Sequence, residues 1–431
     1  MSAPESKGAR PAWAGRRVLI AGAAAVALAL GAVAAVSLDH SAAGHSSGGH
    51  RLAAPSGRTS LRAQLTSLSC SGPTGAAYVA DAGWDGFTAI NTANCGVLQT
   101  YNVGDPYVAT TPATPGDQNY SATDEAVAIS GDTLYFADAG DDNVGIIDTA
   151  NLNTNYYNVS GEIDVHVGFV PTGLTVNPAG TQVWVADSGP QTGPQSPSGI
   201  SILSTASNTV VASFHLPAGP EQVAFSPDGS TAYVTTSAGL YVISTATDQV
   251  TGLIGHLGDP HGVVVSPDGS TVYVTNTVQN VVDVISTATD QVTATIPVGQ
   301  LPWDEVLSSD GKTLYVADPD SNQVSVIDTA TNSVTGTLSV QGDPDTLALT
   351  ADGSQLWVGT LTYCWVFVYS TATLDEVGGI NLAGPGTDNL NYADGFEPTG
   401  IVLTTTSSPG SDSTAKVKLN VPAANLNTNK N

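Results

Sequence analysis

Seven short segments that begin with an aromatic residue recur along this chain of 431 residues. They start at Tyr78, Tyr135, Trp184, Tyr233, Tyr273, Tyr315 and Trp357, at intervals of 57, 49, 49, 40, 42 and 42 residues. Such a repeat constrains the fold strongly, because each copy must be one structural unit that packs on its neighbours. A period of about 42 residues is typical of a four-stranded propeller blade.

The clearest repeat runs from Pro260 to Gly299 and contains four short apolar strands. Its turns, at 267–269 and 287–290, carry the Pro, Asp, Gly and Thr residues that tight turns require. No ten-residue stretch after position 63 shows helical periodicity. The sequence therefore predicts an all-β body.

The first and last repeats have complementary defects. The first, which contains Tyr78, lacks an innermost strand before it, whereas residues 398–403 form such a strand with no second strand after it. Joining the two would hide two open sheet edges. We therefore predict a seven-bladed β-propeller of four-stranded blades over residues 74–405, in which the C-terminal strand completes the first blade.

The repeats resemble the YVTN β-propeller family. The resemblance covers roughly residues 74–405 and is closest at Tyr273-Val274-Thr275-Asn276 and in the Ser-Pro-Asp-Gly turns at 226–229 and 266–269. It implies a seven-bladed propeller of the kind found on prokaryotic cell surfaces, with lactonases and streptogramin lyases as more distant look-alikes. Because the motif is structural, the resemblance implies a fold and assigns no function.

Residues 1–38 have the pattern of a targeting segment. Four basic residues precede an uncharged apolar run over 18–38, which suits either a cleaved signal peptide or a retained membrane anchor. A flexible linker rich in Ser, Gly and His follows over 39–73, and 406–431 is expected to be a flexible tail. Both alternatives place the body outside the cytoplasm, secreted or anchored at the cell surface. The membrane is then contacted only through the N-terminal segment, where that segment is not cleaved.

Charge narrows the range of partners. After position 62 the chain has 36 acidic residues against four lysines and has no arginine. Such a body repels a phosphate backbone, which excludes nucleic acid, and it lacks the arginine fork that usually binds phosphate or carboxylate substrates. We expect a neutral or cationic partner, namely an extracellular glycan, a peptide or a surface protein, and a monomeric chain.

Three cysteines, at positions 70, 95 and 364, suit an exported protein with at most one disulfide. Cys70 precedes the first repeat and Cys95 lies within it, so a Cys70–Cys95 bond is predicted to staple the first blade. Cys364 lies among aromatic and apolar residues and is interpreted as a buried thiol.

The residue after the innermost-strand proline is expected at the mouth of the central channel in every blade. Around the ring this position holds Glu125, Thr172, Glu221, His261, Trp303, Asp345 and Thr399, with Gln222, Asp304 and Thr346 next to it. The long connections at 105–123, 161–170, 188–198 and 383–397 are expected on the same face. We predict a ligand-binding rim here, formed by Glu125, Gln222, Trp303, Asp304 and Asp345.

Three interpretations of this rim remain open. It is a binding surface; or a Ca²⁺ or Mg²⁺ site made by Glu125, Glu221, His261 and Asp345; or simply a solvated channel mouth. If the protein is an enzyme, His261 and Glu221 are the expected catalytic residues of a metal-assisted lyase or hydrolase. Catalytic motifs such as Gly-x-Ser-x-Gly and His-Glu-x-x-His are absent from the sequence. A non-catalytic binding scaffold is therefore the favoured function, with the metal-assisted enzyme as the alternative.

Overall fold

The structure is a computed structural model that describes residues 75–81, 86–102, 124–139, 142–149, 163–189, 198–362, 365–382 and 398–404. The chain divides into two units, Met1–Thr66 and Ser67–Asn431, and all described residues belong to the second. Within the part of the chain that is described, no helix is long and apolar enough to span a membrane. The N-terminal targeting segment, the linker, Cys70, Cys364 and most of the long connections lie outside the described residues.

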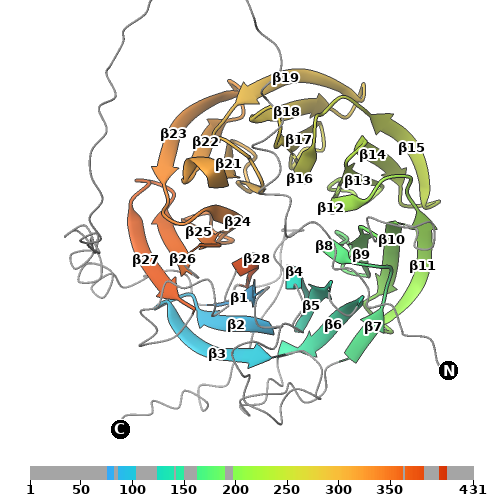
Figure 1. Cartoon of the computed structure of the whole chain (residues 1–431), viewed down its shortest axis with the longest axis horizontal. Coiled ribbons are helices and arrows are strands. Elements are labelled where there is room, and N and C mark those ends of the chain that lie inside the picture. The colour runs from blue at the N-terminus through green and yellow to red at the C-terminus, as the bar shows by residue number, and fades with distance from the viewer. Residues whose placement is uncertain are drawn as a thin grey trace, which may run out of the picture. The chain divides into compact units, whose positions relative to one another are not determined.

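Seven four-stranded antiparallel sheets form a ring around a central axis (Figure 1), and the end of this axis at which the innermost strands begin is called the channel mouth. The innermost strands, in the order of blades 1 to 7, are β28 (Pro398–Leu403), β4 (Asp124–Ser130), β8 (Pro171–Val176), β12 (Pro220–Phe225), β16 (Pro260–Val265), β20 (Glu305–Leu307) and β24 (Pro344–Leu349). The second strands are β1 (Ala76–Asp81), β5 (Thr133–Asp138), β9 (Gln182–Asp187), β13 (Thr231–Thr236), β17 (Thr271–Asn276), β21 (Thr313–Asp318) and β25 (Gln355–Thr360). The third strands are β2 (Gly86–Asn91), β6 (Asn143–Asp148), β10 (Gly199–Ser204), β14 (Gly239–Ser244), β18 (Val281–Ser286), β22 (Gln323–Asp328) and β26 (Trp365–Ser370). The outermost strands are β3 (Gly96–Asn102), β7 (Ile163–His166), β11 (Thr209–His215), β15 (Gln249–Ile254), β19 (Gln291–Pro297), β23 (Ser333–Ser339) and β27 (Glu376–Asn381), and a short 3-10 helix, η4 (Pro319–Ser321), follows β21.

The predicted ring closure is confirmed. β28 pairs antiparallel with β1, with Leu403 opposite Ala77 and Ile401 opposite Val79, so that the two ends of the propeller share one sheet. Three hydrogen bonds between Thr404 and Ala76 extend this pairing beyond the last residue of β28. The blue and red ends of the described chain meet in this blade (Figure 1).

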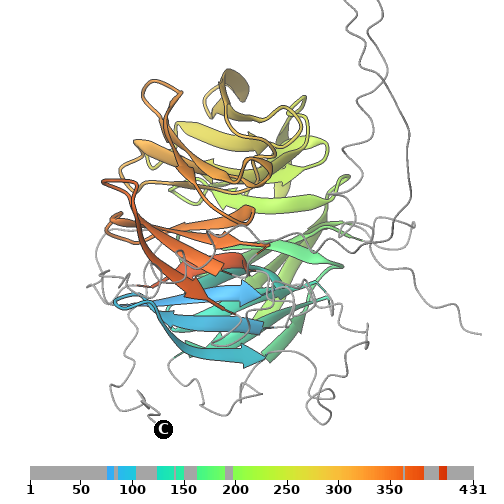
Figure 2. The ribbon, with the colours of Figure 1, turned by 60° about the vertical axis from the view of Figure 1, so that its left-hand side comes forward.

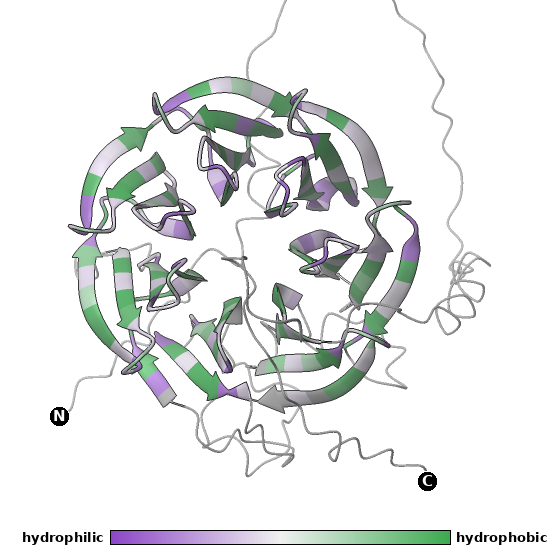
Figure 3. Ribbon diagram, turned by 180° about the vertical axis from the view of Figure 1, so that it is seen from behind, coloured by the Kyte–Doolittle hydropathy of each residue, from purple (hydrophilic) through white to green (hydrophobic). Residues whose placement is uncertain are grey.

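The recurring aromatic residues pack between blades. Tyr78, Tyr135, Trp184 and Trp357 are among the largest fully buried side chains, and each belongs to a hydrophobic cluster that joins two neighbouring sheets. In the side view the blades lie face against face (Figure 2), and apolar residues dominate the strands just inside the outermost ones (Figure 3). Burial of one such side chain contributes about 1.5–3 kcal/mol, so the repeat motif is the device that holds the ring together.

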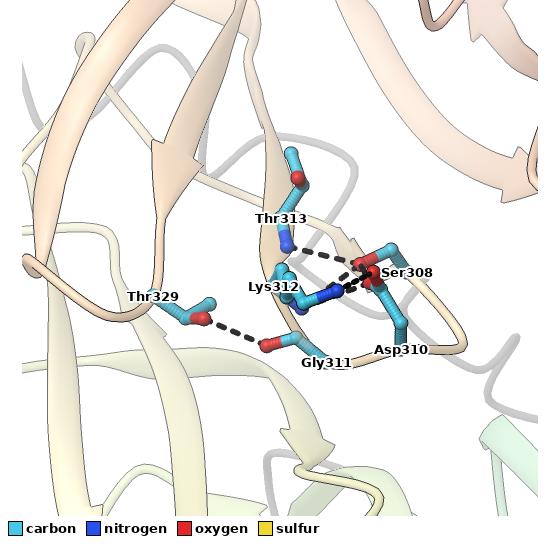
Figure 4. A network of polar contacts seen from close by, with 6 residues as sticks. All are labelled: Ser308, Asp310, Gly311, Lys312, Thr313 and Thr329. Atoms are coloured by element: carbon cyan, nitrogen blue, oxygen red, sulfur yellow. Dashed lines mark hydrogen bonds and ion pairs between the residues drawn. The ribbon is translucent and has the colours of Figure 1, made fainter.

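The turns that join first to second strands form one face, and their aspartates stabilise those turns. Asp228 accepts hydrogen bonds from the Ser226 hydroxyl at 2.6 Å and from the Ser230 backbone N–H at 3.0 Å. These bonds lower the pKa of Asp228 to about 2. In blade 6 the corresponding Asp310 also pairs with Lys312 at 2.8 Å (Figure 4). The opposite face, where the innermost strands begin, therefore carries the candidate site.

Candidate functional site

Each innermost strand begins with a bulge at the channel mouth. In blade 5, Pro260 pairs with Asn276 and Val263 with Val274, so two residues, His261 and Gly262, lie opposite a single residue of β17. The same shift occurs in blades 1, 2, 3, 4 and 7. Bulges redirect side chains and are common next to functional sites.

Blade 6 makes the same bulge with a shorter strand. The Trp303 N–H donates to the Ala317 carbonyl oxygen at 2.9 Å, and the Ala317 N–H donates to the Asp304 carbonyl oxygen at 2.8 Å. Regular pairing then begins at Glu305, which lies opposite Val316. In blade 6, too, two consecutive residues, Trp303 and Asp304, lie opposite the single residue Ala317.

The predicted rim residues occupy these bulges. The first bulge position holds Glu125, Thr172, Glu221, His261, Trp303, Asp345 and Thr399, and the second holds Ala126, Gly173, Gln222, Gly262, Asp304, Thr346 and Gly400. The side chain of Glu125 lies outside the described part of the structure. Among the described side chains, the polar and aromatic ones gather in blades 4 to 7, whereas blades 1 to 3 contribute small or hydroxyl residues.

His261 and Trp303 are stacked across the boundary between blades 5 and 6. Their ring centroids are 3.6 Å apart at an interplanar angle of 28°. The His261 Nδ1 lies 3.0 Å from the Trp303 carbonyl oxygen, and because a carbonyl only accepts, Nδ1 carries the proton. The Thr275 hydroxyl donates to the same oxygen at 3.1 Å. The pair is therefore a fixed aromatic surface at the channel mouth.

Asp304 links three blades. Its Oδ2 accepts a hydrogen bond from the Leu347 backbone N–H of blade 7 at 2.8 Å, and its carboxylate also receives a hydrogen bond from the Gln222 side chain of blade 4. Blades 4 and 6 are not neighbours in the ring, so the contact with Gln222 reaches past the start of the innermost strand of blade 5. Burial, and secondarily the nearby charge of Asp345, raises the pKa of Asp304 to about 7. Asp304 can therefore exchange a proton near neutral pH.

Glu305 is a site residue that the sequence analysis missed. It occupies the first regularly paired position after the bulge, which in the other six blades holds Ile401, Val127, Leu174, Val223, Val263 and Leu347. Its side chain is 7% exposed, and neither carboxyl oxygen has a hydrogen-bond partner within the described residues. Burial, reinforced by the charge of Asp304, raises the pKa of Glu305 well above its ordinary value.

The Glu305 carboxyl points into the bulge of the neighbouring blade. A Cβ atom added to Gly262 would lie 2.0 Å from Glu305 Oε2, so the carboxyl fits only because residue 262 is glycine. The neighbouring Thr275 hydroxyl lies close enough to the carboxyl to lower its pKa slightly, but its hydrogen bond of 3.1 Å goes to the Trp303 carbonyl oxygen. The carboxyl is therefore held against the channel-mouth segment of blade 5 and has no well-formed hydrogen bond from the described residues.

The predicted metal site stays a prediction. The described residues contain no group of three or more His, Cys, Asp or Glu side chains arranged to hold a metal ion. The predicted set of Glu125, Glu221, His261 and Asp345 includes one side chain outside the described part, so the set as a whole is untested. The catalytic roles expected of Glu221 and His261 are likewise untested.

A cavity of about 370 Å³ lies between the outermost strands of blades 2 and 3, where His166, Phe169, Asp187 and His215 contribute to its lining. Asp187 is buried and accepts a hydrogen bond from the Ser201 hydroxyl at 2.6 Å. Asp318 of blade 6 repeats this arrangement with Ser325, also at 2.6 Å. Because the same hydrogen-bonded pair occurs in blade 6, which is remote from the cavity, we attribute the burial of Asp187 to packing within its blade.

Cys95 is disulfide-bonded, and its partner lies outside the described residues. Cys95 lies in the turn between β2 and β3, whose Thr92 N–H donates to the Gly75 carbonyl oxygen at 3.2 Å. That contact places Gly75, five residues after Cys70, beside the turn that contains Cys95. Trp365, which directly follows Cys364, begins β26 at the opposite face of the propeller. The predicted Cys70–Cys95 bond stays a prediction that this topology favours.

Residues 203–346 match the family model described as "Lactonase, 7-bladed beta-propeller". The matched segment covers about a third of the chain and includes the polar bulge residues from Glu221 to Asp345. No curated protein matches the chain. The more specific assignment to YVTN repeats stays a prediction.

Several solved structures are similar in fold. A hydrazine synthase from Kuenenia stuttgartiensis is 21% identical, with 68% of this chain and 90% of that chain covered and a TM-score of 0.55. A protein of unknown function from Desulfotomaculum acetoxidans DSM 771 is 15% identical (77% and 99% covered, TM-score 0.59). The Cps50 (Swd1) β-propeller domain from Myceliophteria thermophila is 12% identical (62% and 87% covered, TM-score 0.52). At these identities the likeness is one of fold alone, and the fold that the chain shares with them is the β-propeller.

Proposed function

We propose that this protein is an exported binding propeller that takes a small neutral or cationic group of its partner into the mouth of its central channel. The residues that contact this group are the bulge residues of blades 4 to 7 together with Glu305. The partner class is the one expected from the sequence, namely an extracellular glycan, peptide or surface protein. The extracytoplasmic location rests on the N-terminal targeting pattern.

The observation that carries this proposal is the burial of the Glu305 carboxyl, which has no well-formed hydrogen bond among the described residues and lies beside a Thr275 hydroxyl that donates to the Trp303 carbonyl oxygen. An unsatisfied buried polar group costs about 1–3 kcal/mol, and an apolar residue fills the same position in every other blade. The repeat thus shows that the fold does not need a carboxyl there. Conflicts between a side chain and its surroundings are expected at functional sites, because ligand binding and not stability accounts for them.

The test is a thermal-shift screen of the full-length chain against monosaccharides, short peptides and primary amines. A ligand that binds at the channel mouth should raise the melting temperature of the wild-type protein but not that of Glu305→Val, the variant that restores the residue of blades 4 and 5. Asp352→Asn, on the opposite face, serves as the control and should respond like wild type. If every hit stabilises Glu305→Val as much as wild type, the site lies elsewhere.

A second candidate function, a hydrolase, is favoured by one specific observation. Asp304 and Glu305 are adjacent carboxyl groups with raised pKa values, and Asp304 titrates at about 7. Such a pair can give and accept a proton near neutral pH, and it lies inside the segment that matches the lactonase model. Hydrolysis of simple γ- and δ-lactones, lost in Asp304→Asn, would favour this function over binding alone.

The metal-assisted form of this enzyme has its own test. Melting of the full-length chain is compared in EDTA, Ca²⁺ and Mg²⁺, for wild type, Glu221→Ala and His261→Ala. A cation at a hundred times its dissociation constant adds about 2.7 kcal/mol, so a bound metal shifts the wild-type melting temperature measurably. If a cation raises the melting temperature of wild type but not that of Glu221→Ala or His261→Ala, the result supports the predicted metal ligands.

A further inference from the structure

We propose that the cavity between blades 2 and 3 binds a small neutral aromatic group that carries a hydrogen-bond donor, of the phenol or indole type. The outermost strands of these blades, β7 and β11, are neighbours in the ring (Figure 1), and their last residues, His166 and His215, line the cavity. The cavity is separate from the channel mouth, and the inference does not rest on the function proposed above.

The first argument is the position of the two histidines in the repeat. Each lies opposite the first residue of the third strand of its blade, so His166 and His215 occupy equivalent positions. In the other five blades this position holds no aromatic residue but Asn102, Gly255, Pro297, Ser339 and Asn381. The fold therefore does not need an aromatic ring there, and the two blades that carry one are the two that border the cavity.

The second argument is the exposed ring of Phe169, which also lines the cavity. Its side chain is 44% exposed, but its carbonyl oxygen accepts a hydrogen bond from the Gly189 N–H at 2.9 Å. The N–H of the next residue, Val170, donates to Asp142 Oδ1 at 2.8 Å, so the backbone around the ring is fixed. The equivalent connection between blades 5 and 6 has Gln300 at this position. An exposed aromatic side chain on a fixed backbone beside a cavity is typical of a ligand-binding site.

The third argument is a missing side chain in the wall of the cavity. Asp187 and Asp318 end the second strands of blades 3 and 6, and in blade 6 the Gln323 side chain donates to Asp318 Oδ2 at 3.2 Å and so covers it. Gly199 has the position of Gln323 in blade 3. A Cβ atom on Gly199 would lie 2.2 Å from the Phe214 carbonyl oxygen, so this position stays without a side chain. The space beside Asp187 is therefore left to the cavity.

The lining favours an aromatic ligand with a donor. Val167, Ile200 and Phe214 contribute apolar surface, and the imidazole and phenyl rings have faces on which another ring can stack. His215 Nδ1 lies 2.5 Å from the Ser198 carbonyl oxygen, which only accepts, so Nδ1 carries the proton and Nε2 of the neutral imidazole is an acceptor. A phenol O–H or an indole N–H supplies the matching donor. The volume of about 370 Å³ is that of a small-molecule site.

A metal ion and an anionic ring fit this lining less well. The described residues contain no group of three or more His, Cys, Asp or Glu side chains arranged to hold a metal ion. The described lining also has no Lys or Arg, so an anionic ring would meet the carboxyl group of Asp187 without a fixed positive charge to balance it.

The experiment is isothermal titration calorimetry on the full-length chain. p-Cresol and indole are the aromatic donors, cyclohexanol is a donor of similar size without an aromatic ring, benzoate is an anionic ring, and ZnCl₂ tests the histidines as metal ligands. The proteins are wild type, Phe169→Gln, His215→Ser and the control Leu253→Thr. The first two variants introduce the residues found at the equivalent positions of blades 5 and 6. Leu253→Thr does the same at an exposed apolar position of β15, outside the cavity lining, and circular dichroism checks that each variant is folded.

We expect p-cresol and indole to bind wild type and Leu253→Thr equally, and to lose about tenfold in affinity in Phe169→Gln and in His215→Ser. Cyclohexanol and benzoate should bind wild type at least about tenfold more weakly than p-cresol does. Cyclohexanol or benzoate binding as tight as that of p-cresol would overturn the ligand class. Zinc binding that is lost in His215→Ser, without any binding of the aromatic probes, would overturn the inference in favour of a metal site. Aromatic probes that do not bind, or that bind both cavity variants as they bind wild type, would overturn the site itself.

Discussion

Replacing Glu305 by valine should stabilise the propeller. In the wild-type protein the carboxyl is 7% exposed and has no hydrogen-bond partner among the described residues. Val223 and Val263 occupy the same position in the two preceding blades, so the backbone of the repeat accepts valine there without strain. The substitution therefore removes an unsatisfied polar group and restores the core of the repeat.

The size of the gain follows from two effects. Removing the unsatisfied carboxyl recovers about 1–3 kcal/mol, while the smaller valine leaves a cavity that takes back on the order of 1 kcal/mol. The pKa of Glu305 is raised in the folded state, so the stability linked to its protonation is complete below the unfolded pKa and is lost as pH rises towards the folded pKa. Wild type thus weakens by up to about 1.4 kcal/mol per pH unit in that range, and the variant does not. The first two effects leave a net gain of about 0–2 kcal/mol at the acidic end, and the gain grows from there as pH rises.

The assay is urea denaturation at several values between about pH 5 and 8, followed by circular dichroism. The gain from Glu305→Val should be small at the acidic end and grow with pH. The reciprocal change, Val263→Glu, should destabilise by about 3 kcal/mol or more, because it buries a carboxyl with no function to retain it. A Glu305→Val protein that is less stable than wild type at neutral pH would refute the reasoning, since the carboxyl would then have a stabilising partner.

Three further predictions concern the fold. Because burial raises the pKa of Asp187 to about 7 and that of Asp318 to about 6, stability should fall as pH rises through this range, and Asp187→Asn should flatten the fall measured by calorimetry. Deleting residues 398–404 removes the innermost strand of blade 1 and should give aggregated protein by gel filtration, where a soluble monomer would contradict the closure. Non-reducing peptide mapping should find Cys95 joined to Cys70, and a Cys95–Cys364 peptide would show that the topological argument is wrong.

The fold was predictable because the same sequence pattern recurs once in every blade of the propeller. Seven aromatic segments fixed the number of blades, and each of them lies on the second strand of a sheet. The complementary defects at Tyr78 and at residues 398–403 predicted the closure that β28 and β1 make. Periodicity, turn residues and unpaired edges are local properties, so one sequence was enough to read them.

The sequence repeat located the residues that precede regular pairing in each innermost strand, but it did not predict their contacts. These residues occupy bulges at the start of the innermost strands, and the bulge that sets two residues against one is not encoded by any local motif. Their role as a binding rim stays a prediction. The contact between Gln222 and Asp304 joins blades that are not neighbours. Such contacts depend on the diameter of the closed ring, which sequence spacing does not specify.

Glu305 shows what the repeat itself can reveal. Counting three residues on from each innermost-strand proline, or from Asp124 in blade 2, reaches an apolar residue in six blades and a glutamate in one. The six other blades act as an internal control, because they share the backbone pattern, and the position is buried in blades 3, 4, 5 and 7 and half-buried in blades 1 and 2. A charged residue that departs from its own repeat at a buried position cannot be explained by the requirements of the fold, since six copies meet those requirements without it. The departure therefore supports the proposed binding function, and it can be recognised within a single chain.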